Sequence, residues 1–385
     1  MFSRRTAHER THNRLTVALE RARARGEPLL DLTLSNPTLA GIPYSPEVTR
    51  AVLEAPGVER YEPLPFGLAG ARAAVSELWS ERGSSVPAEH VAMTASTSEA
   101  YAFAFKLLCD PGEEVLVPAP SYPLFEHLAV LEGVRLVPYR LGYDGAWFVD
   151  AAAVAARVTP ATRAILTVSP NNPTGSYLRK DDLARLAGLG LPIVSDEVFA
   201  EYPLADDPGR ARSALETDAV LVIALDGLSK LAALPHWKLA WMSFGGPRPL
   251  VDEALARLEL VLDTFLSPST PIQRALPELI RTRHVAQNAI RARLRANLDV
   301  LTAACRDSAL SVLRAEGGWY AVLRLPATHT DEDYALSFLE RGVLVQPGYF
   351  FEFGDDPHVV VSLLTPEPTL RAGIARIVES VDETT

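Results

Sequence analysis

The stretch RAILTVSPNNPTGSYLRKDDLARLAGLGLPIVSDEV, residues 163–198, decides the fold class. It begins with a short apolar run (163–169), passes through a turn rich in Asn, Pro and Gly, continues as a helical pattern (180–190) and ends in a second apolar run (192–198). Apolar strands separated by a helix are typical of parallel sheets whose two faces are both covered. We therefore expect a strand, a crossover helix and a parallel strand.

The same alternation continues on both sides of this stretch. Helices are expected at 68–83, 98–109, 122–133 and 150–158, and strands at 89–94, 113–118, 134–139, 219–225 and 239–245. The sequence therefore predicts an α/β fold, with a mostly parallel sheet in a large domain and helices on both of its faces. Ligands of such sheets bind beyond the carboxyl ends of the strands, so the turns that follow the strands should hold the site.

The pattern changes after Gly246, where longer helices and a second group of strands follow. Helices are expected at 247–265, 271–306, 331–341 and 366–382, and strands at 319–325, 343–347 and 358–364. This is the pattern of a smaller α+β domain built from the N- and C-terminal segments. The predicted division is an N-terminal helix and entry segment that joins the small domain (1–45), a large ligand-binding domain (46–265), and a long connecting helix with the C-terminal small domain (266–385).

Composition excludes several classes of function. The chain has 385 residues and a net charge of −11, with no basic stripe, which argues against a nucleic-acid or membrane-surface partner. Its two cysteines are too few for a disulfide framework or a Cys-rich metal site, and no apolar run approaches the ~18 residues of a membrane span. The Arg-rich N-terminus lacks the apolar core of a secretory signal, and its glutamates favour a solvated helix over a transit peptide. We expect a cytoplasmic protein.

The turn after strand 89–94 carries three consecutive hydroxyl side chains where a helix begins. Ser96, Thr97 and Ser98 there offer hydroxyl and backbone N–H donors, which suit an anion. An ordinary helix cap would need the same residue types, so this turn alone does not settle the matter.

Four later turns add an aromatic ring, an amide, a carboxylate and an amine. Tyr122, Asn172, Asp196 and Lys230 each follow an expected strand, and Lys230 is one of only four lysines. Each has an ordinary structural explanation by itself. In this order, with the anion site, they match the needs of pyridoxal 5′-phosphate, namely a stacking face, a donor for the ring oxygen, a carboxylate for the pyridine nitrogen and an amine for the aldehyde.

The motifs NPTG (172–175), DEV (196–198) and SK (229–230) carry a family resemblance. From about residue 28 to 382 the chain resembles the class I/II aminotransferases of the fold-type I pyridoxal-phosphate enzymes, the aspartate-aminotransferase-like superfamily. The resemblance implies a pyridoxal-phosphate-dependent aminotransferase that transfers an amino group from an amine or amino acid to an oxo acid.

The same resemblance assigns roles to individual residues. It implies that Lys230 is the Schiff-base lysine and proton carrier, that Asp196 pairs with the pyridine nitrogen, and that Tyr122 stacks on the ring. It further implies that Asn172 donates to the ring oxygen O3′. The phosphate is expected to bind a cup formed by Ser96, Thr97 and Ser98. Tyr61 resembles a tyrosine that reaches the phosphate of the partner subunit, which implies a homodimer with shared active sites.

Four positions depart from the family pattern. Lys238 stands where an arginine usually pairs with the phosphate, and it lacks the bidentate fork. Phe199 replaces a tyrosine near O3′, and Gly227 replaces a hydroxyl residue near the phosphate. Val360 stands where members that act on α-amino acids carry an arginine for the α-carboxylate. Either the donor is an amine, an ω-amino compound or a larger molecule held elsewhere, or another arginine, such as Arg324 or one across the dimer, binds the carboxylate.

Two alternatives to transamination stay open. The first keeps the cofactor but changes the reaction, to a β-eliminating C–S lyase, a decarboxylase or a specialised biosynthetic enzyme. Transamination leaves pyridoxamine phosphate, whereas elimination returns pyridoxal phosphate, and this separates the two. The second is a non-enzymatic sensor with an aminotransferase-like domain, which the acidic charge makes less consistent with DNA binding.

Overall fold

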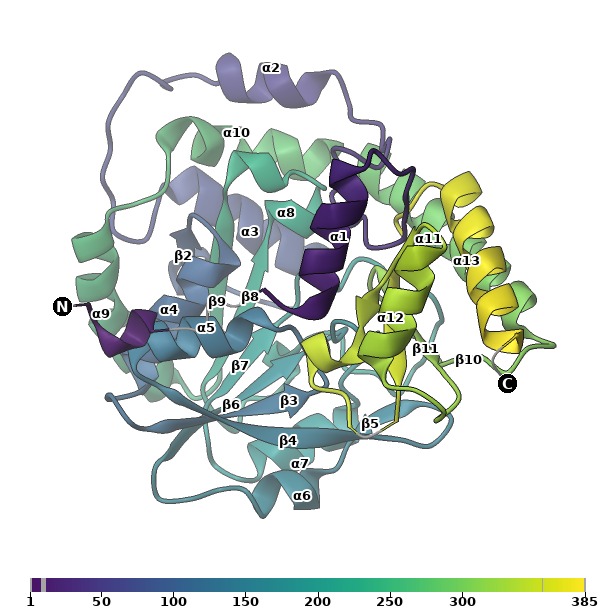
Figure 1. Cartoon of the computed structure of the whole chain (residues 1–385). Helices are drawn as coiled ribbons and strands as arrows, with labels where there is room; N and C mark the ends of the chain where they lie inside the picture. Colours follow the sequence, from purple (N-terminus) through teal and green to yellow (C-terminus); the bar gives the residue numbers. More distant parts are fainter. Residues whose placement is uncertain (1, 8–11, 355, 384–385) are drawn as a thin grey trace.

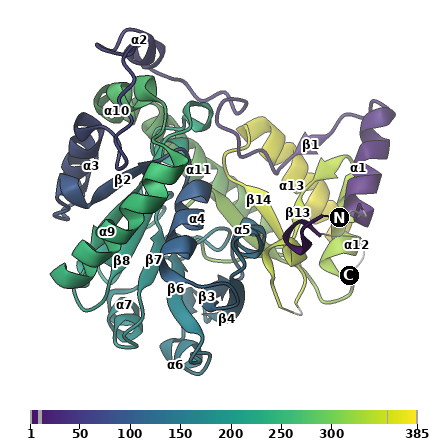
Figure 2. The ribbon, with the colours of Figure 1, turned by 90° about the vertical axis from the view of Figure 1, so that its left-hand side faces the viewer.

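A computed structural model describes residues 2–7, 12–354 and 356–383 of the chain (Figure 1). Residues 8–11 of the predicted N-terminal helix, and the outermost residues of the predicted domains (1 and 384–385), lie outside the described residues. The structure has a large, mostly parallel sheet covered by helices and a smaller antiparallel sheet, so the predicted α/β fold class is confirmed. Figure 2 shows the large sheet with its helices on one side and the smaller part, with α1, α12 and α13, on the other.

The large sheet has eight strands in the order β2-β9-β8-β7-β6-β3-β4-β5. Neighbours from β8 to β4 are parallel, while β9 runs antiparallel to β2 and β8, and β5 antiparallel to β4. The strands span Val91–Thr94 (β2), Glu114–Ala119 (β3), Arg135–Tyr143 (β4), Trp147–Val149 (β5), Thr162–Val168 (β6), Ile193–Asp196 (β7), Val222–Gly227 (β8) and Ala240–Gly245 (β9).

Both faces of this sheet are buried, and side chains alternate between them. Val115 and Val117 pack with α4, α5 and α9, whereas Leu116 between them packs with α6 and α7. Successive side chains of a strand point to opposite faces of the sheet. Because both faces are buried here, most positions along these strands are apolar, and the sequence shows nearly continuous apolar runs. The helices of the two faces span Thr97–Leu108 (α4), Leu124–Glu132 (α5), Ala151–Ala155 (α6), Lys180–Ala187 (α7) and Arg248–Phe265 (α9).

A third cluster covers the β2–β9 end of the sheet. Trp241 of β9 packs there with α3 (Ala69–Glu81) and α10 (Thr270–Thr282), and α2 (Glu47–Leu53) lies against α10 at the outside of the molecule. The short helix α8 (Leu228–Leu231) follows β8 directly and belongs to the same cluster. Within the part of the chain that the structure describes, no helix combines the length and apolar character needed to cross a membrane.

The smaller part centres on a four-stranded antiparallel sheet in the order β10-β11-β14-β13. Two short strands, β1 and β12, pair in parallel beside it. Its core is formed with α1, α11, α12 and α13. These elements span Leu30–Asp31 (β1), Ser311–Val312 (β10), Tyr320–Arg324 (β11), Val343–Leu344 (β12), Gln346–Pro347 (β13), His358–Ser362 (β14), Arg14–Ala24 (α1), His284–Cys305 (α11), Asp331–Glu340 (α12) and Glu367–Asp382 (α13).

The single helix expected at 271–306 is wrong, because the chain forms two helices that meet at Arg283. The Arg283 guanidinium turns back to the carbonyl of Ile280 at 2.6 Å and to Glu81 at 2.5 Å. The reason lies in the packing. Helix α10 buries its apolar face against α3, while α11 buries its own in the core of the smaller sheet. One straight helix would not reach both cores.

The strand expected at 343–347 is also divided. Val343–Leu344 pairs with β1, whereas Gln346–Pro347 pairs with β14, so one short run serves two sheets. The structure adds strands and α-helices that the sequence pattern did not predict, namely β1, β5, β10, α2 and α8. The three strands have only two or three residues each, too few for a two-residue period to stand out.

Candidate active site

A cavity of about 300 Å³ lies where β6, β7 and β8 end, between the large and the small sheet. This is the place expected for a ligand of a parallel sheet. Five residues singled out from the sequence line it: Thr97, Tyr122, Asn172, Asp196 and Lys230. The rest of the lining is Ser35, Val168, Val198, Phe199, Gly227, Ser229, Ala240, Tyr320 and Gln346.

Asp196, the last residue of β7, places a buried carboxylate in the cavity wall. Burial raises the pKa of Asp196, and three neighbours oppose that rise. The Tyr101 hydroxyl donates to Oδ2 at 2.8 Å, the Val198 N–H donates to Oδ1 at 3.2 Å, and the Lys230 ammonium attracts the carboxylate. A buried carboxylate held by two donors is suited to a cationic ligand group.

Lys230 projects from α8 into an aromatic corner of the same cavity. Its Nζ lies 4.7 Å from the ring centre of Trp319 and 5.4 Å from that of Phe199. Burial lowers the pKa of Lys230 to about 8, against the opposing attraction of Asp196. Its backbone is fixed by the Tyr202 hydroxyl, which donates to the Lys230 carbonyl at 2.6 Å. This amine is partly neutral near physiological pH and is therefore a nucleophile.

The two asparagines of the 169–175 turn have different tasks. Asn171 holds the turn together, because its amide donates to the Pro120 carbonyl at 3.0 Å and its oxygen accepts from Ser121 at 2.8 Å. Asn172 lines the cavity, and its buried Oδ1 has no hydrogen-bond partner among the described residues. An unpaired buried amide oxygen beside a cavity fits a ligand that completes its hydrogen bonds.

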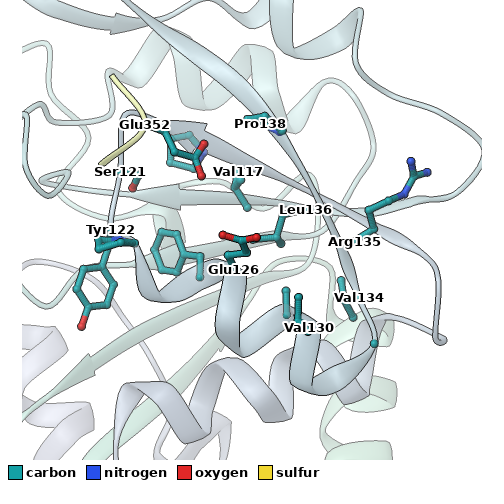
Figure 3. Close-up of a pocket in the computed structure, with 15 residues that line it drawn as sticks. Val117, Ser121, Tyr122, Glu126, Val130, Val134, Arg135, Leu136, Pro138 and Glu352 are labelled. Carbon is teal, nitrogen blue, oxygen red and sulfur yellow. The ribbon is translucent and has the colours of Figure 1, made fainter. Parts of the chain in front are cut away.

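Tyr122 lines both this cavity and a second one of about 410 Å³ beside α5 and β4, and Figure 3 shows the second. The Tyr122 ring is 37 % exposed and meets Phe125 edge-on, with ring centres 5.7 Å apart. The second cavity is larger, but it is lined by Glu126, Arg135 and Glu352 and by neither Asp196 nor Lys230. The smaller cavity, which joins an amine and a carboxylate, is therefore the candidate active site.

The N-terminus of α4 borders the cavity through Thr97. Ser96 is the helix cap, since its hydroxyl oxygen accepts from the Glu99 N–H at 3.1 Å, and Ser98 is exposed. The Glu99 carboxylate in turn accepts from the Ala95 N–H at 2.6 Å. The structure is therefore consistent with both explanations of this turn, a helix cap and an anion site. Ser96 forms the cap, and Thr97 lines the cavity.

Four predicted site residues lie outside the cavity lining, namely Ser96, Ser98, Lys238 and Tyr61. Lys238 is exposed in a left-handed backbone conformation (φ 51°), and the Tyr61 side chain is 75 % exposed. Val360, which stands where the family carries an arginine, is uncharged and fully buried in β14. Arg324 is exposed at the end of β11 and is not among the described residues that line the cavity. No arginine is among the residues that line it.

Several lining residues were not found from the sequence. Ser35 comes from the entry segment, and Tyr320 and Gln346 come from the small sheet. Tyr101, which donates to Asp196, lies one helical turn after Thr97 within an apolar helix. No local pattern marks these four, because their role depends on segments far apart in the chain. Ser229 precedes Lys230 in the SK motif, and this motif was the only feature of the sequence that pointed to Ser229 as a site residue.

Gly227 is required by the close approach of two strands. A Cβ at this position would lie 2.8 Å from the Ala240 Cβ and 3.0 Å from the Leu239 carbonyl oxygen. A hydroxyl side chain therefore does not fit between β8 and β9 as they stand.

Comparisons with known proteins agree with this site. Residues 27–377 match the family model for aminotransferase class I and II. Human tyrosine aminotransferase is 25% identical over 97% of this chain and 86% of its own length. The aspartate/prephenate aminotransferase of Thermus thermophilus is 29% identical over 92% of this chain and 91% of its own.

Solved structures share the fold over the whole chain. An alanine aminotransferase from Pyrococcus furiosus superposes with a TM-score of 0.91 at 24% identity and covers 100% of both chains. A double mutant of Thermus thermophilus aspartate aminotransferase gives 0.85 at 27% identity, over 99% of each chain. The family match spans most of the chain and includes the cavity with its amine and carboxylate, so this protein belongs to the class I and II aminotransferases, which are pyridoxal-phosphate-dependent enzymes.

Proposed function

We propose that the candidate active site binds pyridoxal 5′-phosphate through Lys230 and moves an amino group from an amine or amino-acid donor to an oxo acid. The cofactor supplies an aldehyde for the lysine amine and a protonated ring that withdraws electrons. The observation that carries this proposal is the placement of the Lys230 amine and the Asp196 carboxylate in one cavity, with Tyr122 and Asn172 in its lining.

Lys230 is suited to two tasks. A pKa of about 8 leaves part of the amine neutral, so that it attacks an aldehyde, and part protonated, so that it returns a proton. Trp319 and Phe199 exclude water from its side and stabilise the ammonium through their ring faces. With the cofactor bound, the Lys230 Nζ would be the base in the cavity that takes up and returns the proton.

Asp196, Asn172 and Tyr122 would hold the ring. The Asp196 carboxylate keeps a nearby ring nitrogen protonated, and Tyr101 and Val198 hold that carboxylate in place. The Asn172 side chain lines the cavity, where its Nδ2 amide would donate to the ring oxygen. Tyr122 offers its ring for stacking.

Ser96, Thr97 and Ser98 would bind the phosphate at the N-terminus of α4, where backbone N–H groups and the helix dipole favour an anion. Lys238 would add a positive charge from the loop after α8. Its exposed side chain does not line the cavity, so this contribution requires the lysine to turn toward the phosphate.

We also propose a homodimer in which Tyr61 enters the partner's site. Support comes from the Tyr61 side chain, which is 75 % exposed, and from further apolar side chains that are exposed although large. These include Leu39, Leu53, Leu64, Leu260, Phe265 and Leu266. Exposed apolar groups of this number suit a protein interface. A cytoplasmic location is supported by the two free cysteines, Cys109 and Cys305.

The test of the proposed function is where borohydride fixes the cofactor. Reduction of the holoenzyme followed by peptide mass spectrometry should place the cofactor on Lys230. A Lys230→Ala protein should carry none. Lys180→Ala is the matched control, because the exposed Lys180 side chain lies outside the cavity lining and donates to the Pro208 carbonyl, and this variant should be labelled like the wild type. Label on another lysine would refute the assignment.

A further inference from the structure

We propose that Ser35, Tyr320 and Gln346 form a neutral recognition wall in the active-site cavity. We infer that this wall selects substrates with an uncharged hydroxyl or amide at the position where an α-amino acid has its carboxylate, so that an oxo-acid acceptor carries its acid group at another position. The inference deepens the proposed function and rests on it, because it takes Lys230 and Asp196 as the end of the cavity where the reaction occurs.

The recognition wall belongs to the small sheet and the entry segment, whereas Lys230 and Asp196 come from the large sheet. In the small sheet Gln346 pairs with Val360, and Tyr320 pairs with Ser362. Paired residues of antiparallel strands project to the same face, and residues two apart on a strand share a face. Gln346, Val360 and Tyr320 thus belong to one face of the small sheet, the face toward the cavity.

Charge is confined to one end of the cavity. Among the described lining residues, Asp196 and Lys230 are the only carboxylate and amine, and both are assigned to the cofactor. The recognition wall offers a hydroxyl, a phenol and an amide. Burial raises the pKa of Tyr320, so the phenol stays neutral, and the hydrogen bond from Ser35 only partly opposes the rise. A carboxylate placed here would lose its hydration without gaining a cation, which is costly.

Within the described residues of one subunit, the surroundings of the recognition wall supply no cation either. Val360, beside Gln346, is fully buried and packs with Val322 in an apolar cluster. Arg324, the nearest arginine along β11, is exposed and does not line the cavity. A neutral group that both donates and accepts hydrogen bonds, such as a hydroxyl or an amide, matches the Gln346 amide and the Tyr320 phenol.

The recognition wall is held in place by neighbouring strands. The Ser362 hydroxyl donates to the Leu34 carbonyl at 2.7 Å, and the Ser362 N–H donates to the Leu32 carbonyl at 2.7 Å, which fixes the segment that carries Ser35. Tyr320 meets Phe199 edge-on, with ring centres 6.2 Å apart. Polar groups fixed in advance discriminate between ligands because they do not rearrange to suit a wrong one.

The experiment compares three donors that differ only at this group: alanine, alaninol and alaninamide. Each is titrated into the holoenzyme, and the absorbance of the bound cofactor gives the dissociation constant. We expect alaninol or alaninamide to bind at least about tenfold more tightly than alanine. Alanine binding as tightly as both, or no absorbance change with any of the three, overturns the inference. The borohydride label on Lys230 is independent of these outcomes and reports on the proposed function alone.

Two substitutions of the partly exposed Gln346 test the recognition wall itself. Gln346→Leu keeps the size of the side chain but removes the amide. It should raise the dissociation constant of the preferred neutral donor about tenfold, while that of alanine changes less than about twofold. Gln346→Arg adds a cation and should reverse the preference in favour of alanine. Unaltered cofactor absorbance before titration shows that each variant is folded. Unchanged dissociation constants for all three donors in Gln346→Leu would overturn the role of Gln346.

Discussion

In the proposed function, single side chains control protonation in the cavity, and Asp196 is the clearest example. Asp196→Asn should leave the fold intact but lower turnover at least about 100-fold, because a neutral amide does not keep a ring nitrogen protonated. Circular dichroism checks the fold and a coupled assay measures turnover. Near-normal turnover would contradict the role proposed for this carboxylate.

Tyr101 acts through Asp196 and is a positioning residue. Its hydroxyl donates to the carboxylate at 2.8 Å and lowers the pKa of Asp196. Tyr101→Phe removes that bond, so the pKa of Asp196 should rise and the acid limb of the pH–activity profile should move to higher pH. A merely structural role would lower activity at every pH and leave the profile in place.

The pKa of Lys230 predicts how fast the apoprotein regains cofactor at different pH values. Only the neutral amine attacks an aldehyde, and burial lowers this pKa to about 8. About one tenth of the amine is neutral at pH 7 and about half at pH 8. The rate of reconstitution with pyridoxal phosphate should therefore rise about fivefold between these values and about twofold more at higher pH. A reconstitution rate that keeps rising tenfold per pH unit up to pH 10 would show that Lys230 has the pKa of an ordinary exposed lysine.

At the scale of elements, the contact between β8 and β9 sets the geometry of the site, because Lys230 follows β8 directly. In Gly227→Ala the new Cβ would meet Ala240 at 2.8 Å and force the strands apart. We expect a loss of about 1–3 kcal/mol in the free energy of unfolding, measured in urea, together with weaker cofactor binding.

The matched control for this substitution is Gly70→Ala. A Cβ on Gly70, in α3, would meet nothing within 4 Å, and alanine favours a helix. The free energy of unfolding of this variant should be about 0.5–1 kcal/mol higher than that of the wild type. Equal stability of the two variants would show that the β8–β9 contact tolerates a side chain.

At the scale of the whole molecule, the proposed dimer joins two cavities through Tyr61. Sedimentation should show a dimer of the 41.8 kDa chain. Tyr61→Phe should keep the dimer but weaken cofactor binding about tenfold, because one hydrogen bond to the phosphate is lost. An active monomer, or unchanged cofactor affinity in the variant, would remove this part of the proposal.

The sequence by itself determined the fold class and the main chemical groups of the site. Buried parallel strands have to be apolar along their length, and the turns after them have to carry the ligand groups, so both leave local patterns. The 163–198 stretch, with Asn172 and Asp196, shows both patterns at once. The family membership that these motifs indicated is confirmed by the match over residues 27–377.

Only the tertiary structure decided where the helix at 271–306 breaks and which residues complete the cavity. The break at Arg283 follows from two separate cores, which no helical period records. Ser35, Tyr320 and Gln346 line the cavity together with Lys230 and Asp196, and Tyr101 donates to Asp196, although these four lie about 90 to 195 residues from that pair along the chain. Residue type and spacing encode burial within one element, whereas contacts between distant elements depend on how the whole chain packs.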